Sequence, residues 1–331
     1  MKRIVNTRQK GVVLISVLLI VALATIVATQ MSTRIMGQLQ RASNLELNQQ
    51  AYWYALGAEA FAKRVILTVV DEDPEFINLS QIWAQGETTY PVDSGQIVGE
   101  ISDMQACFNL NALRTDEDNS DNTNKSVQRL GFERLLVNLS LDDIDEFTAE
   151  YMADALVDWL DKNSSIVSAG GAEDNDYAGR EFPYLAANHY LADVSELRVI
   201  EHFTMQAIND LKEYVCVLPN TDLHKLNVNT ISEEHAVLLQ SFLDISLEDA
   251  QEIISERGED GFENIDDVLA LQVLTNAKLT AEEKEQLTVD SDYFKLASRA
   301  SFNNSYFTLA STFKVENNKR VDVIRRSIGK N

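Results

Sequence analysis

The most extended hydrophobic pattern in the chain lies close to its start. An apolar run begins at Val12, and no charged residue occurs between Lys10 and Arg34. A helix over residues 12–33 would be about 33 Å long, enough to cross a bilayer core of about 30 Å. Basic residues precede this run, so we expect the start of the chain to stay cytoplasmic and the part after Arg34 to lie outside.

The helical spacing continues beyond the apolar run. No proline occurs before Pro74, and apolar residues recur at helical intervals from Ile35 to Leu67. We therefore predict one helix over residues 12–69, which becomes amphipathic once it leaves the membrane. Its later apolar face requires other elements to cover it.

Strand patterns occur at two places that are far apart in the sequence. Residues Gln96–Met104 alternate apolar and polar side chains, as half-buried strands do. Three more strand patterns end the chain, and short Asn-containing joints between them favour an antiparallel meander. These three are Tyr293–Phe302, Tyr306–Val315 and Arg320–Ile328.

The segment between these strand regions, residues 108–289, is mainly helical in its spacing, with a strand-like patch at Tyr214–Leu218. The order of elements predicts an α+β fold, in which a long N-terminal helix packs on a small antiparallel sheet and a large helical domain is inserted into that sheet. The expected helices are Val127–Val137, Asp142–Lys162, Val194–Ile200, Thr204–Lys212, Ser232–Phe242, Leu247–Arg257 and Ile265–Leu271.

A short motif occurs twice in this region. Phe108–Leu113 reads FNLNAL and Leu226–Ile231 reads LNVNTI, and each copy precedes a helical run. Alternation places the Asn side chains on one face, where they can cap turns or bind backbone groups. Two interpretations stay open: a repeated hinge into a helical lobe, and chance similarity in an Asn-rich chain.

The net charge limits the kinds of partner that the chain can bind. The net charge of −24 argues against nucleic acid or an anionic membrane as a partner of the part of the chain outside the membrane. It favours a hard cation or a basic surface.

Cys107 and Cys216 are the two cysteines of the chain. In an oxidising compartment we expect them to form a disulfide; the alternative is two unpaired thiols buried as small apolar groups.

Acidic and amide residues are crowded around a Gly-containing stretch. They are Asp158, Asp161, Asn163, Glu173, Asp174, Asn175, Asp176 and Glu181. Such oxygen ligands suit Ca²⁺, although the spacing is not that of an EF-hand, and a solvated acidic loop is the alternative. A second acidic cluster, in residues 116–121, lies in a low-complexity stretch that we interpret as a mobile loop.

Signatures of catalysis and of DNA binding are weak. The sequence contains no H-E-x-x-H, G-x-S-x-G or Walker motif, so we do not expect an enzyme. Residues 226–274 resemble helix-hairpin-helix modules, but the first hairpin, Leu243–Ser246, has no glycine. Between Lys225 and Thr288 there are 15 acidic and 4 basic residues. Such a surface repels phosphate, so we expect no nucleic-acid partner.

Several motifs follow one another along the chain. They are the leader with Gly11 before the apolar run, Phe108–Leu113, Asp158-Trp159-Leu160-Asp161, Gly170-Gly171-Ala172-Glu173-Asp174 with Tyr177, Pro183-Tyr184, and Asn227-Val228-Asn229-Thr230. Taken in this order, they resemble the general secretion pathway protein K family, the large minor pseudopilin of type II secretion. The likeness spans essentially the whole chain.

The resemblance implies a pilin-like fold and a place in a filament. A prepilin peptidase would cut between Gly11 and Val12, and the new amino group of Val12 would be methylated. The single-pass protein would start in the inner membrane, with its ectodomain in the periplasm. Its partners would be minor pseudopilins I and J and the major pseudopilin, with the secretin or exoproteins as further contacts.

The resemblance also implies two special sites. Pilins usually have Glu at the fifth position after the cut, where it pairs with the terminal amine of a neighbour, but this chain has Ser16. Protein K shares this absence, so Ser16 favours a position at the filament tip. Calcium binding by the inserted region is also expected of the family, and we assign the ligands as Asp161, Asn163, Glu173, Asp174 and Asp176.

We divide the chain into five predicted parts. They are a leader (1–11), a transmembrane part (12–33), a pilin-like helix with the first strands (34–107), a mainly helical insert that includes a helix-hairpin-helix or SAM-like part (108–289), and the last strands (290–331). The alternatives are a plain signal anchor, a periplasmic binding protein released by a signal peptidase after Ala24, and a helix-hairpin-helix DNA-uptake protein.

Overall fold

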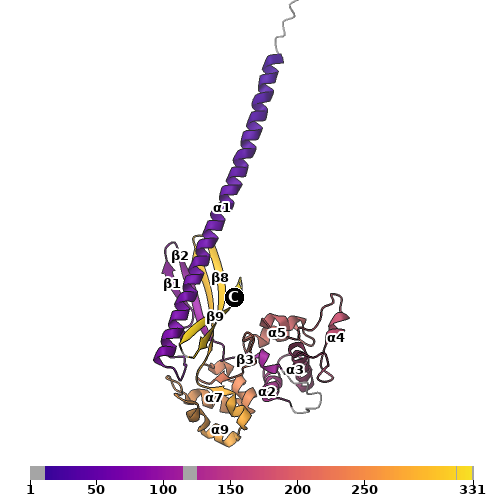
Figure 1. The fold of residues 1–331 in the computed structure, drawn as a ribbon, viewed down its shortest axis with the longest axis vertical. Coiled ribbons are helices and arrows are strands. Elements are labelled where there is room, and N and C mark those ends of the chain that lie inside the picture. The colour runs from indigo at the N-terminus through magenta and orange to yellow at the C-terminus, as the bar shows by residue number, and fades with distance from the viewer. Residues whose placement is uncertain (1–11, 115–124, 318, 330–331) are drawn as a thin grey trace, which may run out of the picture.

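The computed structural model describes residues 12–114, 125–317 and 319–329. Helix α1 (Val12–Glu72) is 61 residues long and projects far beyond the rest of the molecule (Figure 1). Its first buried residue is Ala51, and from there buried side chains recur every three or four positions up to Val69, and Val70 is buried as well. The helix extends three residues beyond the predicted end at residue 69, because no proline occurs before Pro74.

A five-stranded antiparallel sheet covers the last third of α1 (Figure 1). Its order is β1-β2-β7-β8-β9. The strands are β1 (Thr88–Val92), β2 (Gly95–Asp103), β7 (Tyr293–Phe302), β8 (Ser305–Glu316) and β9 (Arg320–Ile328). The sequence did not predict β1, which is short and contains Pro91. Proline is tolerated there because β1 lies at the edge of the sheet.

One face of the sheet packs on α1. Ile66 of the helix is buried with Phe294 of β7 and Phe313 of β8, and the two phenylalanines are register partners. Glu59 is a buried acid in this face of α1; its carboxylate accepts two hydrogen bonds from Arg326, at 2.6 and 2.7 Å, and a third from Ser311. The ion pair with Arg326 and the hydrogen bond from Ser311 hold the pKa of Glu59 below its usual value, although burial opposes them.

In the described residues, all the α-helices after α1 lie between β2 and β7, as an insertion into the sheet (Figure 1), whereas the 3-10 turn η1 (Ile82–Ala84) precedes β1. Together with the long helix and the antiparallel sheet, this confirms the predicted α+β architecture. The helices are α2 (Val127–Asn138), α3 (Glu146–Leu160), α4 (Asp174–Ala178), α5 (Met205–Leu211), α6 (Val237–Leu243), α7 (Leu247–Glu256), α8 (Ile265–Leu269), α9 (Gln272–Ala277) and α10 (Ala281–Glu285); the 3-10 turns are η1 (Ile82–Ala84), η2 (Leu110–Leu113), η3 (Val194–Val199) and η4 (Glu233–His235).

Some predicted boundaries were wrong. The helix expected from Asp142 begins at Glu146, because Ser140 and Asp143 have positive φ angles and Asp145 caps the helix by accepting from the amide of Thr148 at 2.8 Å. The segments expected to form helices over 194–200 and at the start of 232–242 are the 3-10 turns η3 and η4. Helices α4, α9 and α10 are too short to show a helical period in the sequence.

The insert consists of two lobes, each closed by a pair of short parallel strands. In the first lobe β3 (Phe108–Asn109) pairs with β4 (Val215–Cys216), and in the second β5 (Leu226–Asn227) pairs with β6 (Leu287–Thr288). The chain therefore enters and leaves each lobe at one place. The strand predicted over Tyr214–Leu218 is shorter in the structure, where β4 comprises only Val215–Cys216.

The repeated Asn motif performs the same task in both lobes. The side chain of Asn109 accepts from the amide of Asn111, and that of Asn227 accepts from the amide of Asn229. The second Asn of each copy then binds the backbone of a distant segment: Asn111 binds Leu191, and Asn229 binds Phe262. The repeat is therefore structural and not a chance similarity. It fixes the base of each lobe.

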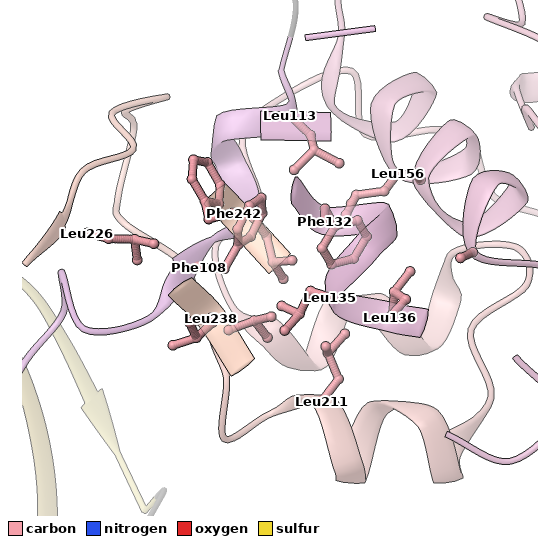
Figure 2. Close-up of a cluster of buried hydrophobic side chains, with 14 of the residues drawn as sticks. Phe108, Leu113, Phe132, Leu135, Leu136, Leu156, Leu211, Leu226, Leu238 and Phe242 are labelled. Carbon is pink, nitrogen blue, oxygen red and sulfur yellow. The ribbon is translucent and has the colours of Figure 1, made fainter. Parts of the chain in front are cut away.

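The two lobes share one hydrophobic core. Figure 2 shows Phe108 and Phe132 of the first lobe packed with Phe242 of the second. The ring centroids of Phe108 and Phe132 are 5.3 Å apart. His224 lies in this core between Phe108 and Phe242, and burial lowers the pKa of its imidazole to about 3. The lobes are thus joined by packing as well as by the chain.

Asp103, at the end of β2, joins the sheet to the second lobe. One carboxylate oxygen accepts from the hydroxyls of Thr230 and Ser291, both at 2.6 Å, and from the amide of Asn227 at 3.2 Å. The other accepts from the amide of Gln105 at 2.7 Å. Burial raises the pKa of Asp103 to about 6, although these hydrogen bonds oppose the shift. No local pattern in the sequence indicates this junction, because its partners are distant along the chain.

Candidate functional sites

The N-terminal part of α1 has the properties of a membrane helix. Residues 12–46 are exposed, and the helix is long and apolar enough to cross a bilayer. Its hydroxyl groups bond within the helix: Ser16 donates to the carbonyl of Val12 and Thr25 to that of Val21, both at 2.9 Å. Internal partners of this kind are needed where no water is present. This part of the chain is consistent with an inner-membrane anchor.

The predicted processing site lies at the very start of this helix. Val12 is the first residue of α1, and Ser16 is one turn further along. Gly11 and the rest of the leader lie outside the described residues, as does the acidic cluster in residues 116–121. Cleavage between Gly11 and Val12, and the role of Ser16, stay predictions.

Cys107 and Cys216 form a disulfide. The bridge joins residues 109 positions apart, with 5.8 Å between their Cα atoms. It stands beside the pairing of β3 with β4, so it links the start and the end of the first lobe. This confirms the predicted bridge and excludes two unpaired thiols.

The structure brings three acidic side chains together at the end of α3 and the start of α4. Asp158, Asp161 and Glu173 are all buried, with exposed fractions of at most 4%. One oxygen of Asp158 accepts from the amide of Val167 at 2.9 Å. The other oxygen of Asp158, and both carboxylate oxygens of Glu173, make no hydrogen bond of good geometry within the described residues. The backbone amides close to them are that of Ala172 for Asp158 and those of Asp174 and Asp176 for Glu173. Such buried carboxylates cost free energy unless something compensates their charge.

The electrostatics of the cluster reflect that cost. Burial, with added repulsion from Glu173 and Asp161, raises the pKa of Asp158 to about 8. Burial, with repulsion from Asp161 and Asp174, raises the pKa of Glu173 to about 7. Because these acids disfavour each other's ionised form, a bound cation would stabilise both.

The other predicted ligands have roles within the loop. Asn163 donates to Asp161 at 2.8 Å and accepts from the amide of Ser165. Asp174 accepts from the amide of Ala186, and Asp176 accepts from that of Glu173. No three His, Cys, Asp or Glu side chains in the described parts of the chain already stand in position to hold a metal. The assigned set omitted Asp158, whose spacing of three residues from Asp161 at the end of one helix was the available signal.

These features define a class of protein: a pilin-like subunit with a membrane helix, a small sheet and an inserted pair of helical lobes. Two family models, both described as type II secretion system (T2SS), protein K, match residues 106–220 and 226–290. These ranges coincide with the two lobes.

Relatives and a solved structure extend the match to nearly the whole chain. Type II secretion system protein K of Aeromonas hydrophila is 35% identical over 97% of this chain and 98% of its own length. That of Klebsiella pneumoniae is 32% identical, over 98% of each. The crystal structure of the GspK-GspI-GspJ complex from enterotoxigenic Escherichia coli matches 88% of this chain and all of the matched chain, with a TM-score of 0.77 and 30% identity.

The chain belongs to the type II secretion system protein K family. It is therefore a minor pseudopilin, as its sequence predicts. The comparisons support this interpretation and not the alternative of a periplasmic binding or DNA-uptake protein.

Proposed function

We propose that this chain is the tip subunit of the type II secretion pseudopilus, where it assembles with minor pseudopilins I and J and nucleates the filament for protein export. The similar crystal structure is that of a complex of GspK, GspI and GspJ, which supports these partners. The main observation behind the tip position is the placement of the insert. Both lobes lie at the end of α1 opposite the membrane segment and extend to one side of the sheet (Figure 1).

This placement suggests how the subunit works. The exposed apolar part of α1 holds the chain in the inner membrane and then packs against the helices of other subunits. The lobes cover the end from which a further subunit would extend the filament, so subunits are added only on the membrane side. The ectodomain lies in the periplasm, and the lobes face the secretin or exoproteins. The role is mechanical and involves no catalysis.

The mature N-terminus separates this proposal from its alternatives. We expect mass spectrometry of the protein from cells to give a start at methylated Val12, because cleavage before the apolar run leaves α1 intact. A start at Thr25 would mean removal of the helix by a signal peptidase, and retention of Met1 would mean a plain signal anchor; either result would contradict a pseudopilin. A strain without prepilin peptidase is the control and should retain Met1.

We also propose that Ca²⁺ binds at Asp158, Asp161 and Glu173. The support is the set of buried carboxylate oxygens that make no hydrogen bond of good geometry within the described residues. Ca²⁺ takes six to eight oxygens in flexible geometry, so the amide oxygen of Asn163, backbone carbonyls and water would complete the shell. The ion would supply charge compensation that holds the loop between α3 and α4.

The calcium proposal predicts a pH-dependent stabilisation. The pKa values of Asp158 and Glu173 are raised in the folded protein, to about 8 and about 7. Without metal, their stability contribution is therefore full below their unfolded pKa values and is lost as the pH rises through 7 to 8. At pH 8, calcium at a hundredfold excess over Kd should raise the free energy of unfolding by up to about 2.7 kcal/mol, which is seen as a higher melting temperature. The rise should be much smaller at pH 5.

A double variant tests the assignment of the site. Asp158→Asn with Glu173→Gln should abolish the calcium-induced rise in melting temperature, and should stabilise the metal-free protein at pH 8 by removing the repulsion. The control, Glu146→Gln with Glu213→Gln, changes two exposed acids of the same lobe and should keep the calcium response. An unchanged response in the first variant would exclude this site.

A further inference from the structure

The exposed large apolar side chains of the insert are concentrated in the first lobe. In the described part of the second lobe, Leu247 alone is exposed in this way. In the first lobe, four such residues lie on the two loops that flank α4: Ile166, Val167, Phe182 and Leu185. Phe182 is the most exposed of these four, at 78%. Helix α4 and these loops form the end of the lobe farthest from the sheet (Figure 1).

The backbone around these side chains is fixed. The amide of Val167 donates to Asp158, and the amide of Ala186 donates to Asp174 at 3.0 Å. Between Phe182 and Leu185, the ring of Tyr184 stacks on Tyr177 with 5.2 Å between centroids. The apolar side chains are therefore held outward by an ordered frame, although nothing in the described part of the fold covers them.

The surface continues from these loops onto the first half of α3. A Cβ atom at Gly170 would lie 2.5 Å from the Cα atom of Tyr151, so the loop runs directly against the helix there. Tyr151 is exposed, and so is Phe147, one turn earlier. We call these six residues (Phe147, Tyr151, Ile166, Val167, Phe182 and Leu185) the distal face.

The charges around the distal face restrict what it can bind. Over residues 142–186 the exposed charged side chains are six acids and one base: Asp142, Asp143, Asp145, Glu146, Asp176, Glu181 and Lys162. A second copy of the chain would bring the same acids against each other, and anionic lipid would be repelled. The complementary partner has apolar side chains surrounded by basic ones.

We propose that the distal face is a docking surface for a basic, amphipathic segment of a partner protein. Apolar side chains of that segment would pack on Phe182 and Leu185, and its Lys or Arg residues would meet nearby exposed acids such as Glu181. This extends the proposed tip function and rests on it, because the face lies on the inserted first lobe, at the side of the molecule away from the sheet (Figure 1).

Peptide binding to the full-length chain tests the proposal. The protein is placed in nanodiscs of zwitterionic lipid, and signal from empty nanodiscs is subtracted. The probes are a short fluorescent peptide of alternating Leu and Lys and its counterpart with Glu in place of Lys. We expect the Lys peptide alone to bind, and Phe182→Ser with Leu185→Ser to weaken it more than about tenfold. Leu247→Ser, which removes an exposed apolar side chain from the other lobe, should leave the affinity within about twofold.

Three results would overturn the docking surface: equal binding of both peptides, unchanged affinity in the double variant, or an equal loss in Leu247→Ser. Failure here is distinguishable from failure of the tip position, because the assay uses the single chain and needs no filament. Circular dichroism of the variants, expected to match the parent, excludes unfolding as the cause of a loss.

Discussion

Replacing Asp103 with alanine should lower the free energy of unfolding by about 2–5 kcal/mol, because it leaves buried hydrogen-bond donors without their acceptor. Four donors would lose a hydrogen bond: the hydroxyls of Thr230 and Ser291, the side-chain amide of Asn227 and the backbone amide of Gln105. Thr230 and Asn227 keep other acceptors, so within the described residues the hydroxyl of Ser291 and the amide of Gln105 are left without one. Each buried donor left without a partner costs about 1–3 kcal/mol, and the removal of a desolvated carboxylate offsets part of the sum.

Chemical denaturation of the full-length chain in uncharged detergent measures this effect. Glu100→Ala changes an exposed acid of the same strand and should stay within about 0.5 kcal/mol of the parent. The pKa of Asp103 is raised to about 6, so its stability contribution is greatest below its unfolded value and declines as the pH rises through 6. The difference between parent and variant should accordingly be larger at pH 5 than at pH 8. If Asp103→Ala lost no more stability than Glu100→Ala, this would contradict the claim that Asp103 joins the sheet to the second lobe.

Removal of the disulfide should have a comparable effect. Changing Cys107 and Cys216 to Ser frees a loop whose ends are 109 residues apart. The chain-entropy description gives about 4.7 kcal/mol for a loop of about 100 residues, and native bridges typically contribute about 2–4 kcal/mol. We therefore expect the free energy of unfolding to fall by about 2–4.7 kcal/mol. The first lobe should be destabilised most, because the bridge closes its base.

Dithiothreitol provides the matched control. It should lower the stability of the parent to that of the double Ser variant, and it should leave the variant unchanged. In hydrogen-exchange measurements, reduction of the parent should speed up the exchange of backbone amides over residues 108–216 more than that of the amides in the sheet. Insensitivity of the parent to the reductant, under conditions in which the thiols are shown to be reduced, would contradict a stabilising role for the bridge.

The long helix and most of the sheet were predictable, because each has a strong local period. The run from Val12 has no helix-breaking residue, and the last three strands are separated by polar joints. Strand β1 was missed because Pro91 is typical of a loop unless the strand is known to be an edge. The start of α3 was misplaced because Ser140 and Asp143 have positive φ angles, which are not evident from the sequence, and the helix begins only after the cap at Asp145.

The candidate sites were predictable only in part, because they depend on contacts between distant segments. Asp161 and Glu173 were identified from their surroundings in the sequence. Asp158 was named in the same acidic group but left out of the assigned ligands, because its burial against Glu173 follows from how α3 meets α4. Asp103 likewise looked like the end of a strand, since nothing local indicates that Thr230 and Ser291 reach it.

The position of this subunit in the filament is the central claim, and labelling of isolated pseudopili tests it most directly. Gold-tagged antibody against the inserted lobes should mark one end of each pilus in electron micrographs, because the lobes cover the end of α1 opposite the membrane segment. An antibody against the major pseudopilin should label the whole length of the same filaments. If the antibody against the lobes marked the filament at regular intervals along its length, this would contradict the tip position.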